Sequence, residues 1–219
     1  MTDTTIAFLD LTRFTALADV HGDNFALGVI DAFVDAVDAA VQGRGRIAKT
    51  MGDGVLLQLH GPGDAVVVAD EVSQRLHGTT GMPELTAGIA TGPVVERDGD
   101  VFGTTVNLAS RLAGLAAPGE MLATAAAARA AAHAGWQVEP LGLTPIRGLH
   151  DPVCVHRVVL CPVQDCVTDP VCGMRITPVP ATPSDVVDGR RLWLCSPTCL
   201  ERLRSAPERY LGEDVIARG

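Results

Sequence analysis

The chain has 219 residues, of which 47% are hydrophobic and 20% are charged, so it can form a packed core and is not a disordered chain. Its formal net charge of -9 argues against binding DNA or RNA, because contact with backbone phosphates needs clustered Lys and Arg. It shows neither a signal peptide nor an apolar stretch of bilayer-spanning length, which predicts a soluble, cytoplasmic protein without a membrane partner.

The first 160 residues alternate between strand-like and helix-like segments. The expected elements are a strand over 5–11, a helix over 23–41, strands over 46–51 and 55–60, a helix over 64–76, a strand over 85–95, a helix over 105–113, a strand over 119–124 and closing strands within 141–160. Gly52-Asp53-Gly54 predicts a tight turn between two of the strands. This order predicts an α+β fold of the ferredoxin-like type, an antiparallel sheet with helices on one face.

Two carboxylates stand where the predicted sheet would bring them together. Asp10 ends the first strand and Asp53 lies at the hairpin tip, and in a ferredoxin-like sheet this hairpin is the neighbour of the first strand. Paired carboxylates that hold magnesium are a recurring device in phosphoryl chemistry. Each residue has a plain structural alternative, Asp53 as an ordinary Asp-Gly turn residue and Asp10 as a helix N-cap.

Three segments together resemble the motifs of class III nucleotide cyclases in their order and approximate spacing. These segments are Phe8 to Thr15, Lys49 to Gly54 and Asp100 to Arg111. The resemblance implies a cyclase domain over residues 1–160 with adenylate cyclase activity. Such an enzyme forms 3',5'-cyclic AMP and pyrophosphate from ATP by attack of the ribose 3'-hydroxyl on the α-phosphate, assisted by two Mg2+ or Mn2+ ions per active site.

The resemblance implies that Asp10 and Asp53 hold the metal ions and that Lys49 and Asp100 bind the purine. A Lys donor can serve adenine N1 and an Asp carboxylate can accept from the 6-amino group, whereas guanine presents the reverse pattern. Guanylate cyclases usually carry a carboxylate in place of this Lys, so the pair favours ATP. A solvated strand lysine and a turn aspartate are the plain alternatives.

Asn107 and Arg111 lie four residues apart, so on a helix they project from the same face. The resemblance implies that Asn107 orients the ribose and that Arg111 stabilises the transition-state phosphate with its fork of donors. Arg147 falls where relatives often carry a basic residue near the triphosphate, and a plain surface role fits it equally well. Arg13 departs from the family, whose members usually have Gly there; it either perturbs the metal geometry or points to solvent.

One chain carries both halves of the proposed chemistry. In this family the metal carboxylates come from one subunit, and the purine and transition-state residues come from the other. A chain that holds both sets predicts a symmetric homodimer with two composite sites. Two other functions stay open: a catalytically weak nucleotide-binding or metal-sensing regulatory module, and a guanylate cyclase.

All six cysteines follow residue 150, which sets a second unit apart from the first. In a cytosolic chain, clustered cysteines indicate metal ligation or redox chemistry more than disulfides. We expect residues 161–168 to be a linker and residues 169–214 to be a small domain that needs a metal staple. Asp169 to Met174 and Trp193 to Cys199 resemble the YHS family of small metal-associated domains, including the related TRASH pattern.

Three cysteines of this unit are candidate ligands of a second metal site. Cys195 and Cys199 are four residues apart, so on a helix they would share a face and, with Cys172, could reach one Zn2+ or Cu+ ion. No histidine nearby in the sequence offers a fourth ligand, and Cys166 in the expected linker is the remaining candidate. Buried thiols without a metal and a thiol switch are the alternatives. The fusion of the two units suggests that metal or redox state regulates the cyclase.

Overall fold

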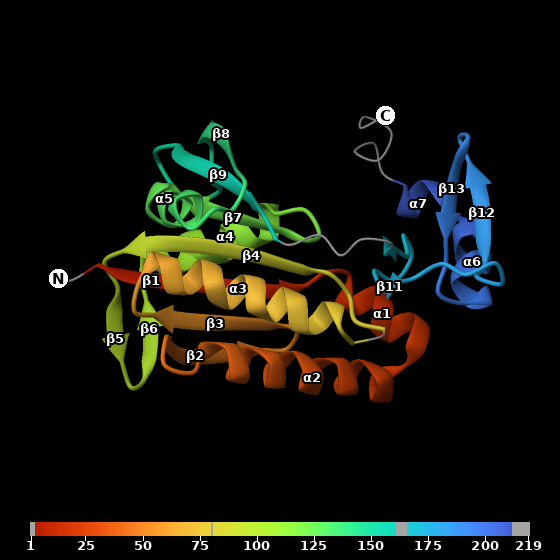
Figure 1. The fold of residues 1–219 in the computed structure, drawn as a ribbon, viewed down its shortest axis with the longest axis horizontal. Helices are drawn as coiled ribbons and strands as arrows, with labels where there is room; N and C mark the ends of the chain where they lie inside the picture. The colour runs from red at the N-terminus through yellow and green to blue at the C-terminus, as the bar shows by residue number, and fades with distance from the viewer. Residues whose placement is uncertain (1–2, 80, 161–165, 212–219) are drawn as a thin grey trace.

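A seven-stranded sheet forms the centre of the molecule in the computed structural model, which describes residues 3–79, 81–160 and 166–211 (Figure 1). Its strands are β1 (Thr4–Leu11), β2 (Gly45–Met51), β3 (Gly54–Leu59), β4 (Leu85–Gly92), β7 (Glu120–Thr124), β8 (Val138–Thr144) and β9 (Val153–Val159). They follow the order β2-β3-β1-β4-β7-β9-β8, in which β4 and β7 are parallel and the other neighbours are antiparallel. The expected α+β fold with a mainly antiparallel sheet is confirmed.

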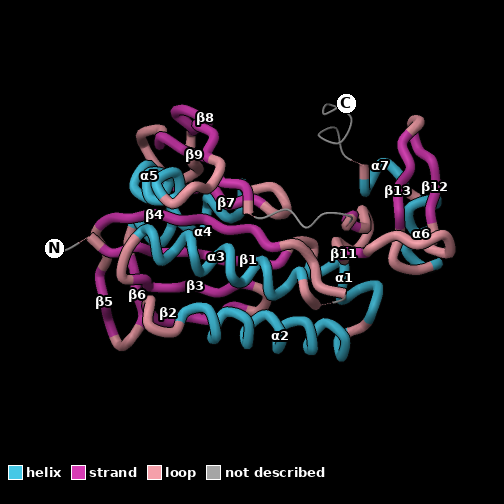
Figure 2. The backbone as a smooth tube through the Cα atoms, in the orientation of Figure 1, coloured by secondary structure: helices cyan, strands magenta, loops and turns pink. Residues whose placement is uncertain are grey.

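Helices cover both faces of this sheet (Figure 2). They are α1 (Phe14–His21), α2 (Asp23–Val41), α3 (Pro62–His77), α4 (Thr104–Leu115) and α5 (Ala125–His133). Leu9 and Leu57 point into the main core, which also holds the buried residues of α2, α3 and α5. Ile6 and Leu56 point the other way, because side chains alternate along a strand, and they pack against Ala109 of α4. The expectation that all helices lie on one face is therefore wrong for α4.

Small hairpins and short helices make up the rest of the described chain. These elements are the hairpin of β5 (Val95–Arg97) and β6 (Asp100–Phe102), the pair β10 (Val167–Thr168) and β11 (Arg175–Ile176), the hairpin of β12 (Ser184–Val187) and β13 (Arg190–Trp193), and helices α6 (Pro197–Ser205) and α7 (Pro207–Tyr210).

The C-terminal unit, residues 166–211 of the described chain, packs against the sheet domain beside α1 (Figure 1). Its buried Val171, Leu194 and Leu203 belong to the same core cluster as Leu17 of α1. The expected boundaries of the two domains and the linker stay predictions, and residues 161–165 and 212–214 of those ranges lie outside the described residues.

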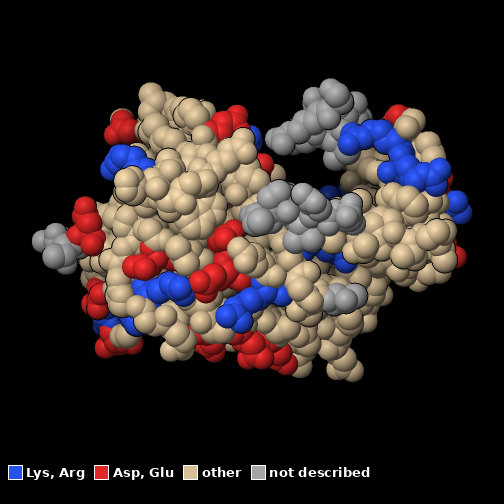
Figure 3. All heavy atoms as spheres, in the orientation of Figure 1, with Lys and Arg blue, Asp and Glu red and all other residues tan. Residues whose placement is uncertain are grey.

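Charged side chains are unevenly distributed over the surface. In the face shown in Figure 3, basic side chains gather over the C-terminal hairpin, whereas acidic and basic side chains are interspersed over the sheet domain. Among the helices of the described residues, none is long and apolar enough to cross a membrane.

Candidate functional site

The two predicted metal carboxylates lie together at one end of β1. Asp10 pairs in register with Gly54 of β3, and the backbone N–H of Leu11 donates to the carbonyl oxygen of Asp53 at 3.1 Å. The turn between β2 and β3, in which Gly52 has a φ of 65°, therefore brings Asp53 against the end of β1. A Cβ atom on Gly54 would lie 2.9 Å from Asp10 Oδ1, so a glycine at this position leaves room for the carboxylate.

The electrostatics of this pair favour a bound cation. Burial and then the charge of Asp53 raise the pKa of Asp10 to about 6. A half-buried carboxylate beside a second one is thus disfavoured as an anion until a positive charge offsets the repulsion. Carboxylate oxygens are also the donors that Mg2+ and Mn2+ prefer, so the residues present fit a divalent-ion site.

The two predicted purine-binding residues also meet. Lys49 lies opposite Leu56 in the register of β2 and β3, and its Nζ atom is 3.0 Å from Asp100 Oδ2 on β6. The hydrogen bond from Lys49 is the main reason that the pKa of Asp100 is lowered, and a second bond from the Val101 N–H adds to it. This pair presents one donor and one acceptor side by side at a solvent-accessible position.

Helix α4 displays Asn107 and Arg111 on its exposed side. The helix lies close against the sheet because Gly88 of β4 has no side chain: a Cβ atom there would be 2.0 Å from the carbonyl oxygen of Ala109. Within the described residues, no hydrogen bond or ion pair joins Asn107 or Arg111 to the carboxylate pair or to the purine pair. One chain therefore assembles the two pairs but does not join them to the residues of α4.

Arg147 lies exposed in the segment between β8 and β9. Its neighbour Ile146 is buried against Leu112, the residue that follows Arg111 on α4. Arg147 is therefore held beside the second half of α4, and its contact with a phosphate stays a prediction.

The three predicted cysteine ligands converge, and a histidine from the sheet domain joins them. Cys195 Sγ lies 3.6 Å from Cys172 Sγ, 3.6 Å from Cys199 Sγ and 3.5 Å from His21 Nε2. The four ligand atoms all lie within 4.8 Å of one another. The sequence placed no histidine near these cysteines, but the fold does, because His21 ends α1 at the surface on which the C-terminal unit packs.

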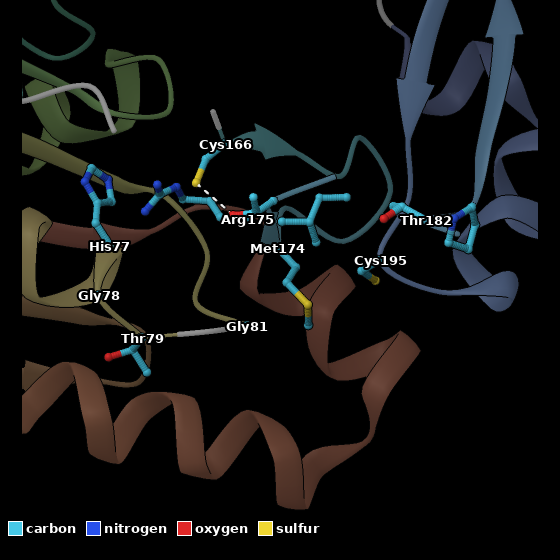
Figure 4. A pocket seen from close by; sticks show the side chains of 12 residues that line it. His77, Gly78, Thr79, Gly81, Cys166, Met174, Arg175, Thr182 and Cys195 are labelled. Atoms are coloured by element: carbon cyan, nitrogen blue, oxygen red, sulfur yellow. Dashed lines mark hydrogen bonds between the residues drawn. The ribbon is translucent and has the colours of Figure 1, made fainter. Parts of the chain in front are cut away.

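The other sequence candidate for a fourth ligand, Cys166, lies apart from this cluster. A pocket separates the C-terminal unit from the end of α3, and Figure 4 shows the side chains around it. Its lining includes His77, Gly81, Met174 and Arg175. Cys166 also lines this pocket, and its Sγ atom is 3.5 Å from Thr177 Oγ1. It is not one of the four clustered ligands.

Comparison with known proteins relates the sequence to adenylate cyclases. No family model matches the chain. It is 40% identical over 112 residues to an adenylate cyclase of Streptomyces coelicolor, which covers 51% of this chain and 29% of that protein. It is 30% identical over 158 residues to a pH-sensitive adenylate cyclase of Mycobacterium tuberculosis, which covers 70% of this chain and 40% of that protein. The chain thus spans less than half of the length of these relatives.

A solved structure shows which fold the chain shares with such proteins. The adenylate/guanylate cyclase/hydrolase of Silicibacter pomeroyi matches with a TM-score of 0.64 and 25% sequence identity. This match covers 72% of the chain and 96% of the solved protein. Nearly three-quarters of the chain therefore has the fold of adenylate and guanylate cyclase catalytic domains.

Proposed function

We propose that the chain is an adenylate cyclase that converts ATP into 3',5'-cyclic AMP and pyrophosphate. The observation that carries the proposal is the pairing of Asp10 with Asp53 at one end of a sheet whose edge strand holds Lys49 against Asp100. Sequence similarity to named adenylate cyclases supports it.

In the proposed reaction, the ribose 3'-oxygen attacks the α-phosphorus of ATP. The new bond between O3' and the α-phosphorus forms while the bond from that phosphorus to the oxygen bridging it to the β-phosphate breaks. Pyrophosphate leaves with the electron pair of the broken bond, and the 3'-hydroxyl proton passes to solvent. Mg2+ or Mn2+ held by Asp10 and Asp53, two ions per site, would neutralise phosphate charge and lower the pKa of the attacking hydroxyl.

The chain's other site residues bind and orient the nucleotide in this proposal. Lys49 donates to adenine N1, and Asp100 accepts from the 6-amino group. This arrangement rejects guanine, which has a hydrogen-bond donor at N1 and an acceptor at the 6-position. Asn107 orients the ribose from the exposed face of α4. Arg111, one helical turn later, directs its fork of donors at the charge that develops on the α-phosphate.

The proposed enzyme acts as a homodimer with composite sites. Asn107 and Arg111 are exposed, and no hydrogen bond or ion pair among the described residues joins them to the carboxylate pair. In the proposal, a second copy places them over the same nucleotide. Apolar side chains flank them on the same helix segment: Phe102 just before α4 is 49% exposed, and Leu115 at its end is 56% exposed. A symmetric partner would bury these side chains and would close two equivalent sites.

An assay of the purified chain with ATP or GTP, and with Mg2+ or Mn2+, tests the proposal. We expect cyclic AMP from ATP as the main product and near-complete loss of it in Asp53→Asn. Asp188→Asn is the matched control, because Asp188 precedes a glycine in the exposed hairpin turn between β12 and β13, and that hairpin holds none of the proposed site residues. This control should keep its activity.

Each other outcome assigns the chain differently. Cyclic GMP as the main product would contradict the purine assignment. No product from either nucleotide would favour a nucleotide-binding module without catalysis. Equal losses in Asp53→Asn and Asp188→Asn would reduce Asp53 to a turn residue.

A further inference from the structure

Three of the six separations among the His21, Cys172, Cys195 and Cys199 ligand atoms are close to those of a tetrahedral metal site, and all six lie within 4.8 Å. Around a zinc ion with ordinary bond lengths, sulfur atoms lie about 3.8 Å apart, and a sulfur and a nitrogen lie about 3.6 Å apart. In the cluster, Cys195 Sγ lies 3.6 Å from each of the other two sulfurs and 3.5 Å from His21 Nε2. A cluster already at these distances needs little movement to bind an ion.

Packing alone does not explain this convergence. Cys172 and Cys199 are fully buried, and thiols are weak hydrogen-bonding groups, so burial gives no reason to aim three sulfurs at one imidazole nitrogen. A disulfide would need about 2.05 Å between sulfurs, and Cys195 Sγ lies 3.6 Å from each of the other two sulfurs. Any single disulfide would also leave the third thiol and the histidine without a role.

The backbone around the cysteines is fixed by a buried carboxylate. Asp169 has no exposed surface, and its oxygens accept from the N–H groups of Val171 at 2.7 Å, Cys172 at 3.4 Å and Cys195 at 2.7 Å. One side chain therefore ties together the two loops that carry two of the ligands. Cys199 is held separately, since its N–H donates to Ser196 Oγ, the N-cap of α6. Such outer-shell bonds orient metal ligands.

His21 is held on the opposite side of the cluster by the sheet domain. It ends α1, and its ring lies against that of Phe25 with a centroid separation of 5.2 Å. The other end of α1 also contacts the C-terminal unit, because Arg13 Nη1 donates to the carbonyl oxygen of Pro170 at 2.7 Å. Between these ends, Asp19 pairs with Arg202 of α6. The C-terminal unit therefore contacts the start of α1 at Arg13 and its last turn at Asp19 and His21.

We propose that His21, Cys172, Cys195 and Cys199 form a Zn2+ site that fastens the C-terminal unit to helix α1. Zinc suits the site because it accepts mixed thiolate and imidazole ligands in tetrahedral geometry. The site closes only when both units contribute, so zinc binding holds α1 in place. This helix begins four residues after Asp10, and the C-terminal unit thereby acts on the segment next to the carboxylate pair. The inference does not depend on the proposed cyclase activity.

Zinc titration of the reduced, metal-free full-length chain against a competing chelator tests the site. We expect one Zn2+ per chain and an affinity that falls on the order of 100-fold in His21→Ala, because a first-coordination ligand is lost. His133→Ala is the matched control, since His133 is an exposed histidine at the end of α5, and it should bind zinc like the wild type. Co2+ in place of zinc should give thiolate charge-transfer bands that Cys199→Ser weakens.

Amide hydrogen exchange of the same samples tests the fastening of α1. Zinc should slow exchange over residues 14–21 in the wild type and in His133→Ala, but not in His21→Ala. Circular dichroism checks that the metal-free variants are folded. A second variant, His21→Asn, repeats the test with a polar side chain in place of the alanine of His21→Ala. Unchanged affinity and protection in both His21 variants would confine the site to the C-terminal unit and overturn the proposal. Failure of the reduced wild-type chain to bind zinc would overturn the site itself.

Discussion

Asp10 places function and stability in conflict at a single residue. The raised pKa of this carboxyl means that the folded protein binds its proton more tightly than the unfolded chain does. Without divalent ions, the stability of the fold therefore decreases as the pH rises from about 4 through 6, and it stays lower above that range. A metal ion would relieve this cost, which is the physical reason to expect a charge-binding role here.

Removing the Asp10 charge should stabilise the metal-free protein. At pH 7.5 in the presence of a chelator, we expect Asp10→Asn to raise the free energy of unfolding by on the order of 1 kcal/mol, a value reduced for the partial exposure of the side chain. Urea unfolding would measure the change. The gain should disappear near pH 4, where the wild-type carboxyl is protonated in the folded state.

Asp31→Asn provides the control for this measurement. Asp31 is an exposed aspartate on α2, so the same chemical change there should leave stability nearly unchanged. A metal-free Asp10→Asn protein that is no more stable than the wild type would contradict the destabilisation of the charged Asp10 by burial and by Asp53.

At the scale of elements, the sequence predicted the long regular segments better than the short ones. Helices α2, α3 and α4 were expected within a few residues of their observed bounds, because their apolar residues recur over several turns. Helix α1 was not expected. It has eight residues and one buried side chain, Leu17, and no side chain caps its start. Arg13, in the left-handed region with a φ of 55°, stands where a capping residue would have marked the boundary.

Two features of the site depend on contacts distant in sequence, which patterns along the chain do not encode. The packing of α4 on its face of the sheet includes the close approach of Ala109 to Gly88, which a side chain at Gly88 would prevent. The fourth cysteine-cluster residue, His21, is separated from Cys172 by the entire sheet domain. The approach of Asp10 to Asp53 was predictable, because a ferredoxin-like sheet makes the hairpin the neighbour of the first strand. The approach of Lys49 to Asp100 was predictable only from the family resemblance, which implies that both residues bind the purine.

Substitutions of Arg13 separate backbone strain from docking at the start of α1. Arg13→Gly and Arg13→Ala both remove the 2.7 Å bond to Pro170, but only glycine adopts this φ without strain. We expect Arg13→Gly to be more stable than Arg13→Ala by about 1 kcal/mol in urea unfolding. Both variants should speed amide exchange over residues 169–176, because both lose the same contact. Equal stability of the two variants would show that the backbone at residue 13 relaxes once the guanidinium is gone.

At the scale of the whole molecule, the two units pack against each other and are not joined by the linker alone. Arg175 of the C-terminal unit lies 2.8 Å from Glu84, which directly precedes β4, and both side chains are largely buried. Met174 forms a bridge with Pro83 beside this pair. The cysteine distribution along the chain indicated two units, but it carried no information on this shared core. A structural change at the cysteine cluster could therefore reach the sheet through these contacts next to β4.

Mixing two inactive variants should test whether the nucleotide site is shared between copies. In the proposed homodimer, Asp53→Asn would lack a metal carboxylate and Arg111→Ala would lack the transition-state cation, so each variant dimer would have two defective sites. In a mixed dimer, one site combines both defects and the other combines the intact Asp53 of one copy with the intact Arg111 of the other. Random exchange makes half of all dimers mixed, and the cyclic AMP rate should therefore return to about a quarter of the wild-type rate. If each site were built within one chain, the mixture would stay as inactive as its components, although both variants remain folded and dimeric.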